Sequence, residues 1–313
     1  MSNSRSLSTQ EVAELLHVSR STIYDLIRRG ELHSYRIGRK VRFTQDDVDA
    51  YIARARHEQK VRRVQRSEVQ STLLHPEPPK NGRLILSGQD VILDLLANQL
   101  AKQEVGAERC YLNSFEGLLS LYQGRVNAAA CHLYDAEEDA FNVPFVKKLL
   151  PGIPVVLVNL SYRAVGFYVA AGNPKGIEGW EDLKRSDLSI RNRAPGSSPR
   201  ILLDGQLKRM GVDARKLRGY DIEMKNHLTM AAAIAAGEAD LAIGTERISG
   251  QIEGLDFIRL MTERLDLAIR RQDLETPAGE QLMEALNAGV FRRALRGISG
   301  NDYQDLGKIL WEG

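Results

Sequence analysis

The chain has 313 residues, of which 43% are hydrophobic and 27% are charged, so it can bury the cores of more than one folding unit. Its only two cysteines, Cys110 and Cys131, exclude a disulfide framework and a cysteine-based metal site, and we expect both in the core. No apolar run approaches a membrane span, and residues 1–9 lack the hydrophobic segment of a signal peptide. These features predict a cytoplasmic protein with no membrane partner.

Charge is unevenly distributed along the chain. Residues 1–66 hold 14 Lys and Arg against 8 Asp and Glu, a net charge of +6, whereas the rest holds 29 against 33, a net charge of −4. A basic segment attached to a mildly acidic body is typical of a nucleic-acid-binding domain. The alternative is that the surplus of six positive charges belongs to an ordinary solvated surface. The charge therefore supports DNA binding without establishing it.

The first domain, assigned to residues 1–56, is predicted to contain two short helices, a hairpin and a third helix. Ser8 and Glu11 have the spacing of a capping box, which starts the first helix. Ser19 can cap a second helix that ends at Gly30, and residues 32–43 alternate between apolar and polar side chains as a hairpin does.

The second helix and the hairpin carry the candidate DNA contacts. Polar residues at the start of such a helix read base edges, whereas basic residues of a helix or hairpin contact phosphates. The candidates are Ser19, Arg20, Ser21, Thr22, Tyr24 and Arg28 in the helix, and Arg36, Arg39, Lys40 and Arg42 in the hairpin. A plain solvated strand pair is the alternative, but helix spacing and a basic hairpin occur here together.

Residues 7–53 resemble the excisionase family of winged helix-turn-helix domains. The resemblance is carried by Leu7-Ser8-Thr9-Gln10-Glu11-Val12-Ala13, by Val18-Ser19-Arg20-Ser21-Thr22-Ile23-Tyr24 and by Arg36-Ile37-Gly38-Arg39-Lys40-Val41-Arg42-Phe43. It implies that the second helix and the wing bind double-stranded DNA.

Residues 57–82 are predicted to be a linker, because they are rich in charged residues and glutamine and end in a proline cluster. Two interpretations stay open. The segment is either a solvated helix or a helical dimer seam through Val61, Val64 and Leu73.

The second domain, residues 83–313, alternates strand-like and helical runs, which predicts an α/β fold. The strand-like runs are 84–86, 155–158, 165–170, 188–190 and 240–243, and the helical ones are 91–103, 201–210 and 228–236. Three turns place hydroxyl groups where helices are expected to begin, at Ser87, Ser114 and Ser197–Ser198. Each alone is an ordinary helix cap, but together they favour a cleft for a small anion.

Residues 83–310 resemble periplasmic-binding-protein-like domains related to type II molybdate-binding proteins. The resemblance is carried by His132-Leu133-Tyr134-Asp135, Phe141-Asn142-Val143-Pro144-Phe145, Gly172-Asn173-Pro174-Lys175-Gly176, Gly196-Ser197-Ser198-Pro199-Arg200 and Gly300-Asn301-Asp302-Tyr303. It implies two lobes, lobe I at 83–165 and 264–313 and lobe II at 166–263, with the ligand between them. Where relatives commonly read Gly-Ser-Gly-Thr-Arg, Pro199 removes an amide, which puts the family's ligand specificity in doubt.

The predicted ligand contacts are Ser87, Gly88, Ser114, Arg163, Arg193, Ser197, Ser198, Arg200 and His227. The three arginines either pair with an acidic ligand or form salt bridges, and His227 either donates to an anion or is a core histidine.

The fold class predicted is therefore a two-lobed α/β, type II periplasmic-binding-protein-like sensor with a small winged helix-turn-helix domain. The predicted function is a one-component transcription regulator with a small anionic effector, first molybdate or tungstate, alternatively an organic carboxylate or sulfonate. It binds an operator as a homodimer or larger oligomer and uses no cofactor or metal. A transport protein, an enzyme on the two-lobed fold and an architectural excisionase are the rival interpretations; the sequence shows no nucleophile–base pair.

Overall fold

The computed structural model describes residues 6–51 and 83–313, except residues 17, 29–31, 39, 49–50 and 104 and the side chains of Arg36 and Ile37. It divides into two compact units, residues 1–71 and 72–313, which are described separately. The predicted linker at 57–82 lies outside the described residues. Within the described part of the chain, no helix is long and apolar enough to cross a membrane.

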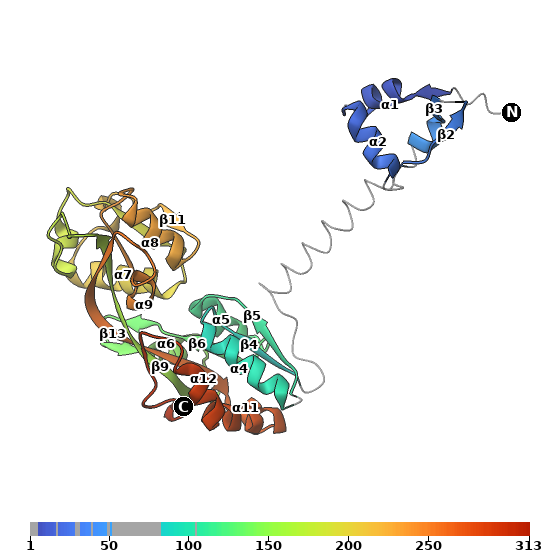
Figure 1. The fold of residues 1–313 in the computed structure, drawn as a ribbon. Helices are drawn as coiled ribbons and strands as arrows, with labels where there is room; N and C mark the ends of the chain where they lie inside the picture. Colours follow the sequence, from blue (N-terminus) through green and yellow to red (C-terminus); the bar gives the residue numbers. More distant parts are fainter. Residues whose placement is uncertain are drawn as a thin grey trace. The chain divides into compact units, whose positions relative to one another are not determined.

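The N-terminal unit packs two helices against a small antiparallel sheet (Figure 1). The helices are α1 (Thr9–Leu15) and α2 (Arg20–Arg28), and the sheet has the order β1 (Leu7–Ser8), β3 (Lys40–Phe43), β2 (Tyr35–Ile37). The capping box predicted for α1 is confirmed, because the Ser8 hydroxyl accepts from the Glu11 amide at 3.3 Å and Glu11 accepts from the Ser8 amide at 2.8 Å.

The core of this unit draws on every predicted element. Ile23 and Leu26 of α2 are buried, as the apolar spacing of that helix requires, and they pack with Phe43 of β3. Val48, from the helical residues 45–48 after the hairpin, joins them. The polar side chains of α2 are left on its outer face.

The C-terminal unit is built on one ten-stranded mixed sheet. Its main path is β11 (Glu223–Met224), β10 (Ile190–Arg193), β12 (Leu241–Thr245), β9 (Val155–Ala170), β13 (Leu255–Arg270), β6 (Ala128–Cys131), β4 (Leu84–Ser87) and β5 (Ala107–Cys110). Strands β14 (Asn301–Asp302) and β15 (Ile309–Glu312) also pair with β9. The pairs β4–β5, β4–β6, β10–β11 and β10–β12 are parallel.

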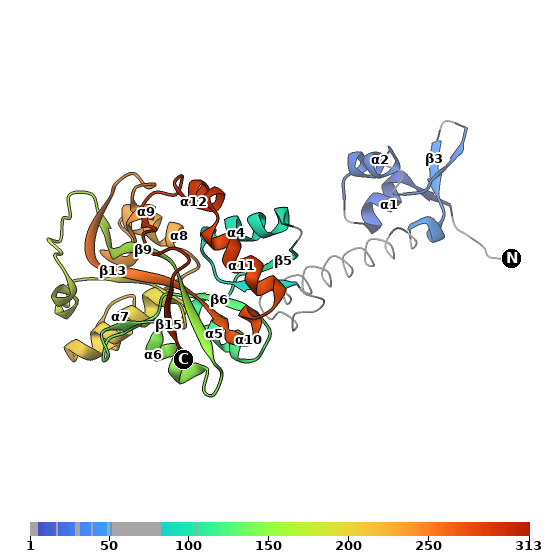
Figure 2. The same cartoon turned by 90° about the horizontal axis from the view of Figure 1, so that it is seen from below.

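Two 16-residue antiparallel strands, β9 and β13, run through both lobes (Figures 1 and 2). Strand β9 changes neighbour between Arg163, which pairs with β14 in lobe I, and Val165, which pairs with β12 in lobe II. The register of the pair shifts at Arg259/Met261 and at Leu265/Asp266, so the ladder is interrupted where the chain crosses.

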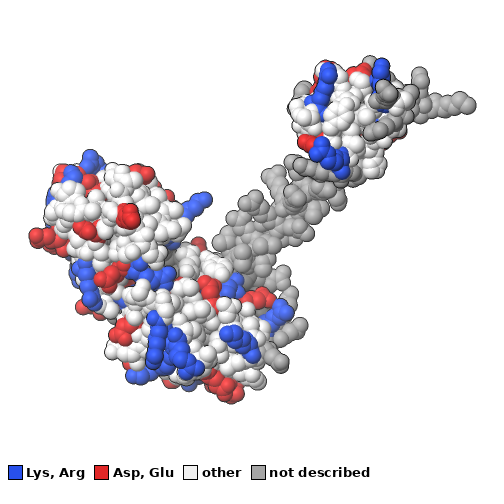
Figure 3. Space-filling view, in the orientation of Figure 1, with Lys and Arg blue, Asp and Glu red and all other residues white. Residues whose placement is uncertain are grey.

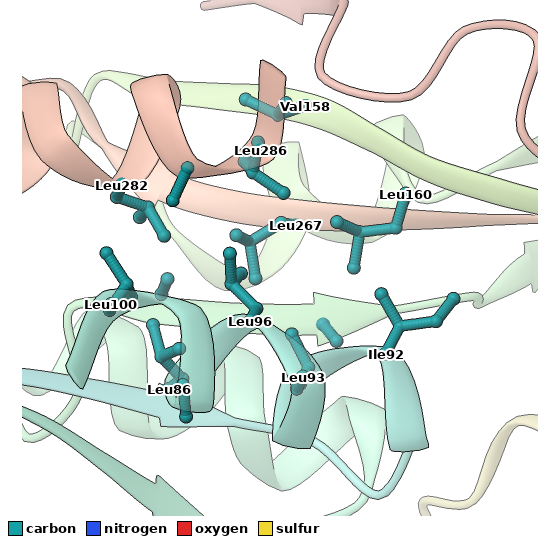
Figure 4. Close-up of a cluster of buried hydrophobic side chains, with 14 of the residues drawn as sticks. Leu86, Ile92, Leu93, Leu96, Leu100, Val158, Leu160, Leu267, Leu282 and Leu286 are labelled. Carbon is teal, nitrogen blue, oxygen red and sulfur yellow. The ribbon is translucent and has the colours of Figure 1, made fainter. Parts of the chain in front are cut away.

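Helices cover both faces of the sheet in each lobe. In lobe I, one face carries α4 (Val91–Lys102), α11 (Pro277–Asn287) and α12 (Gly289–Leu295), and the other carries α5 (Ser114–Tyr122) and α6 (Val143–Leu149). In lobe II, α7 (Ser198–Met210) covers one face, and α8 (His227–Ala235) with α9 (Glu246–Ser249) covers the other. Figure 4 shows the largest core, where leucines of α4 and α11 meet the apolar side chains of the strands.

The two cysteines are buried in lobe I, as expected from composition. The α/β class is confirmed, and the predicted runs at 155–158 and 165–170 prove to be one strand, β9. The sequence patterns do not reveal β13, because the half of β13 in lobe II is only partly covered and shows no clean alternation. The lobe boundaries predicted at 165/166 and 263/264 fall inside β9 and β13.

A glycine pair fixes the close contact of β9 with its neighbours in lobe II. Gly166 lies opposite Gly244 in the register, and a Cβ on Gly166 would lie 2.1 Å from the carbonyl oxygen of Ile258 on β13. A Cβ on Gly244 would meet the buried ring of Tyr168 at 2.1 Å. Neither position has room for a side chain.

We therefore expect Gly166→Ala to destabilise the C-terminal unit by about 1–3 kcal/mol, because the added methyl group must displace backbone. Both tryptophans, Trp180 and Trp311, lie in this unit, so thermal unfolding followed by tryptophan fluorescence reports on it alone. Gly250→Ala is the control, since its nearest neighbour would be 4.0 Å away in a helical conformation. An unchanged midpoint for Gly166→Ala would show that the strand pair can move apart.

Candidate functional site

The start of α2 presents a polar surface to solvent. The side chains of Ser19, Arg20, Ser21 and Thr22 are exposed, and Tyr24 is 49% exposed. The Ser19 hydroxyl accepts from the Thr22 amide at 3.2 Å, so Ser19 caps the helix, and it also bonds the hydroxyls of Ser21 and Thr22. Arg20 donates to Gln10 of α1. The first turn of α2 thus forms a hydrogen-bonded polar face of the kind that reads base edges.

Further basic residues of this unit lie at the end of α2 and on the hairpin. Arg28 is exposed and its ion pair with Asp25, at 3.3 Å, is solvent-screened. Lys40 and Arg42 are two residues apart on β3 and so point to the same face of the hairpin. Figure 3 shows basic side chains on the surface of this unit. Arg39 and the side chain of Arg36 lie outside the described residues.

A cleft of about 550 Å³ separates the two lobes of the C-terminal unit, where Figure 3 shows the surface indented. It lies beyond the carboxyl ends of the parallel strands of both lobes, as open α/β sheets generally place a ligand. Gly88 follows β4, His132 follows β6, and Arg193 ends β10. Its volume is in the usual range for small-molecule sites, about 300–1,000 Å³.

Arg193 is buried in the wall of the cleft without a charged partner. It is 6% exposed, and its Nε and Nη1 atoms have no hydrogen-bond acceptor. Its Nη2 donates to Gln89 of lobe I at 3.4 Å. Burial lowers the pKa of Arg193, since nothing opposite it compensates the charge. A buried guanidinium with unused donors is suited to bind carboxylates and similar anions.

Arg163, by contrast, is fully engaged. It pairs with Asp90 at 2.5 Å and with Glu263, and all three side chains are at least 88% buried. Burial works against the charge of Arg163, but the two carboxylates raise its pKa above the usual value. Burial would raise the pKa of Asp90, but Arg163 and the Ile92 amide hold it below the usual value. Of the two alternatives predicted for Arg163, the structure shows the salt bridge.

The floor of the cleft carries hydroxyl groups and two neutral histidines. The Ser198 hydroxyl of lobe II donates to Ser114 of lobe I at 3.0 Å, and Ser114 lies 3.3 Å from Nδ1 of His132. Burial and the nearby arginines lower the pKa values of His132 and His227 to about 3, so both rings are uncharged at neutral pH. Nδ1 of His227 is buried and unpartnered.

Helix N-termini point at the cleft from both lobes. Asn113 and Asn226 cap α5 and α8, and each accepts an amide of its own helix. At α7 the Ser197 side chain makes no such bond and instead donates to the carbonyl of Ala194 at 2.7 Å. The first amides of α7 are therefore available to a ligand, apart from the one that Pro199 lacks.

The structure brings together seven of the nine predicted ligand contacts as residues that line the cleft. These are Gly88, Ser114, Arg163, Arg193, Ser197, Ser198 and His227.

Ser87 and Arg200 are not among the lining residues. Ser87 was expected at a helix start, but Asp90 is the cap of α4, and Ser87 is fully buried at the end of β4 beside Gly117. Arg200 follows Ser198 by two positions, about 200° around the helix, so it points away and stacks on Tyr220 at 3.9 Å.

Sequence reasoning missed several residues that line the cleft beside the predicted ones. Tyr111 and Asp94 come from lobe I, and Lys225, Leu228 and Arg247 come from lobe II. Their only signal is proximity to the strand ends, and for β12 the sequence predicts the strand but not the turn that follows it. Four cations line the cleft against two carboxylates, so the walls carry a net positive charge.

The fold and the cleft define a class of protein. A helix-turn-helix domain is joined to a two-lobed α/β domain of the kind found in periplasmic binding proteins. Residues 6–56 match the family model of a helix-turn-helix domain, and residues 97–287 match the family model of a PBP superfamily domain. The chain therefore belongs to the family of proteins that contain a PBP superfamily domain. The architecture is that of a regulator rather than an enzyme.

Relatives share this arrangement over the whole chain or in part. The uncharacterized protein YvgK of Bacillus subtilis is 36% identical over 318 residues, which cover 100% of both chains. A Clostridium pasteurianum protein from the 5′ region of a ferredoxin gene is 39% identical over 112 residues, covering 36% of this chain and 99% of the relative. An uncharacterized Mycobacterium bovis protein is 52% identical over 48 residues, covering 15% of this chain and 42% of the relative.

Solved structures confirm the fold of the C-terminal unit. An ancestral amino-acid-binding protein has a TM-score of 0.51 at 15% identity and covers 69% of this chain and 95% of its own. An ancestral arginine-binding protein has a TM-score of 0.50 at 16% identity, with coverages of 70% and 99%. At this identity the likeness concerns the fold alone.

The wing leads to a first prediction for the site. Replacing Lys40 and Arg42 with Ala removes two cations on one face of the hairpin, so DNA affinity falls for all sequences alike. The slope of log affinity against log salt concentration should decrease by about 1 for each phosphate that a removed cation had neutralised. Fluorescence anisotropy with duplex DNA at several salt concentrations measures this slope. The control is Lys216→Ala, which removes an exposed cation from the C-terminal unit. An unchanged slope would show that the wing does not touch phosphates.

The uncompensated charge of Arg193 leads to a second prediction. Arg193→Met should raise the stability of the unliganded C-terminal unit by about 1 kcal/mol or more, since it replaces a buried, unpaired cation with an apolar side chain. Tryptophan fluorescence during thermal unfolding measures the change. Arg191→Met is the control on the same strand, because Arg191 donates to the Glu238 carbonyl at 2.6 Å and should lose stability. A loss with Arg193→Met would mean that this guanidinium stabilises the empty cleft.

Proposed function

We propose that the protein is a one-component transcription regulator. Its N-terminal domain binds operator DNA, and a small anion bound between the lobes of the C-terminal domain changes that binding. The observation that carries the proposal is Arg193, which is buried in the cleft with two unused donors. Burying such a charge costs free energy unless an anion compensates it, so the cleft is suited to an anionic ligand.

The net positive walls and the free N-terminus of α7 also favour a negatively charged ligand. Molybdate, tungstate, organic carboxylates and sulfonates all carry a negative charge. None of these needs a cofactor. Both histidines of the cleft are neutral, so the positive charge that attracts the anion comes from Arg193 and not from them, and amides and hydroxyl groups add hydrogen bonds.

Helix-turn-helix proteins commonly pair their DNA-binding domains on symmetric sites, so we propose a homodimer or larger oligomer. A DNA-binding regulator works in the cytoplasm. Light scattering of the full chain with and without DNA measures the oligomeric state.

The proposal is tested by DNA binding in the presence of anions. Duplex fragments selected by the full chain from genomic DNA are titrated with protein in molybdate, tungstate, sulfate, phosphate and simple organic acids. We expect at least one anion to change DNA affinity by about 5- to 150-fold, the usual range of such coupling.

Two variants make this test specific to the cleft. Arg193→Gln should bind the same DNA without anion but lose the response, whereas Arg191→Gln should retain it. A chain without residues 83–313 should also lose the response. If no anion changes DNA binding, or if the truncated chain still responds, the proposal is wrong.

A further inference from the structure

We propose that the effector is an organic acid that carries no cationic group, with its acid group on Arg193 and an apolar body between Tyr111 and Leu228. This inference rests on the proposed function for the site, and it narrows the ligand from any small anion to one chemical class. Three observations carry it: the free donors of Arg193, the ion pairs that the carboxylates of the cleft already make, and the apolar side chains at the rim of the cleft.

The acid group has a defined place. Nε and Nη1 of Arg193 are both buried without an acceptor, and each forms a two-donor edge of the guanidinium together with Nη2. Nη2 carries two hydrogens and donates to Oε1 of Gln89 at 3.4 Å, so one hydrogen of Nη2 stays available beside Nε or Nη1. A carboxylate or sulfonate accepts two parallel hydrogen bonds from such an edge. The uncapped start of α7 and the unpartnered Nδ1 of His227 are further polar groups of the same cleft.

A ligand ammonium group has no such place. Two carboxylates line the cleft among the described residues, and the charge of each is already paired with an arginine. Asp90 pairs with Arg163 at 2.5 Å. Oδ1 of Asp94 pairs with Arg109 at 2.8 Å and accepts from the Tyr111 hydroxyl at 3.0 Å. An amino acid would bring a positive charge into walls that are already net positive, so the cleft rejects zwitterions and cations.

The rim of the cleft gives the ligand its apolar part. Tyr111 of lobe I is 45% exposed and Leu228 of lobe II is 48% exposed, and both line the cleft. Val91 and Ile248, which are half-buried, also line the cleft. The volume of an inorganic oxyanion is comparable to that of a few water molecules, about 30 Å³ each. Such an ion would leave most of the cleft to solvent. An organic body instead covers these exposed apolar side chains.

The test uses matched ligands on the full chain, with binding measured by calorimetry and by tryptophan fluorescence during thermal unfolding. The acids 3-phenylpropionate and hexanoate are compared with phenylalanine and norleucine, which are the same skeletons with an α-ammonium group. Acetate tests the acid group without a body, and molybdate and sulfate test inorganic anions. We expect one or both acids to bind at least about tenfold more tightly than every other probe, because only they match both parts of the cleft.

Variants then assign the two parts. Arg193→Gln should weaken the preferred acid by about a hundredfold, whereas Arg191→Gln should not. Leu228→Ala should weaken it by about five- to twentyfold and leave acetate unchanged, since it removes only apolar contact. Val290→Ala is the control, because Val290 is similarly exposed, at 44%, but lies on α12 outside the cleft.

The outcomes separate this inference from the proposed function. Tighter binding of an amino acid, or of molybdate or sulfate, would overturn the ligand class while leaving an effector site in the cleft. Failure of both organic acids to bind would also overturn it. Binding of an acid that leaves DNA affinity unchanged would support the ligand class and refute the regulatory proposal.

Discussion

The antiparallel pair of β9 and β13 is the constraint on which the C-terminal domain depends. Each strand belongs to both lobes, so neither lobe has a complete sheet without the other. At the crossing, buried Asp266 accepts from Arg264 at 2.7 Å and from Asn142 and Asn159 at 2.8 and 3.2 Å. Because the crossing strands hold the two half-sheets together, the carboxyl ends of their parallel strands face a common cleft.

The cleft inherits its charge from this arrangement. Arg163 lies on β9 and Glu263 on β13, so the crossing pair itself supplies the ion pair that neutralises one arginine of the cleft. Arg193 ends β10 opposite Met224 of β11, and its Nε and Nη1 have no acceptor. Two arginines of one cleft therefore differ: Asp90, the cap of α4, and Glu263 balance the charge of Arg163, whereas Arg193 has no such partner and is the residue that we propose to hold the anion.

Sequence patterns predicted what local chemistry determines. The Ser8–Glu11 capping box and the apolar face of α2 depend on residues within one or two turns, and both are confirmed. Partners far apart in the chain were not predictable: Asp90 and Glu263 lie 73 and 100 residues from Arg163. Ser87 and Arg200 were misplaced because one residue of strand length, or about 200° of helix rotation, decides whether a side chain faces the cleft.

A buried arginine without a counter-ion lowers the stability of the fold, so its presence points to a function. Burying the unpaired charge costs free energy during folding, and an anion that binds to it offsets this cost. The offset contributes to the affinity of the anion. Gln89 from lobe I and Arg193 from lobe II meet at this point, and Ser114 and Ser198 meet nearby across the same cleft. The anion that we propose on Arg193 would therefore lie where the lobes are in contact. A ligand changes an equilibrium between lobe arrangements only by its difference in affinity for them. A group buried between two lobes has such a difference, because opening the lobes would expose it to water.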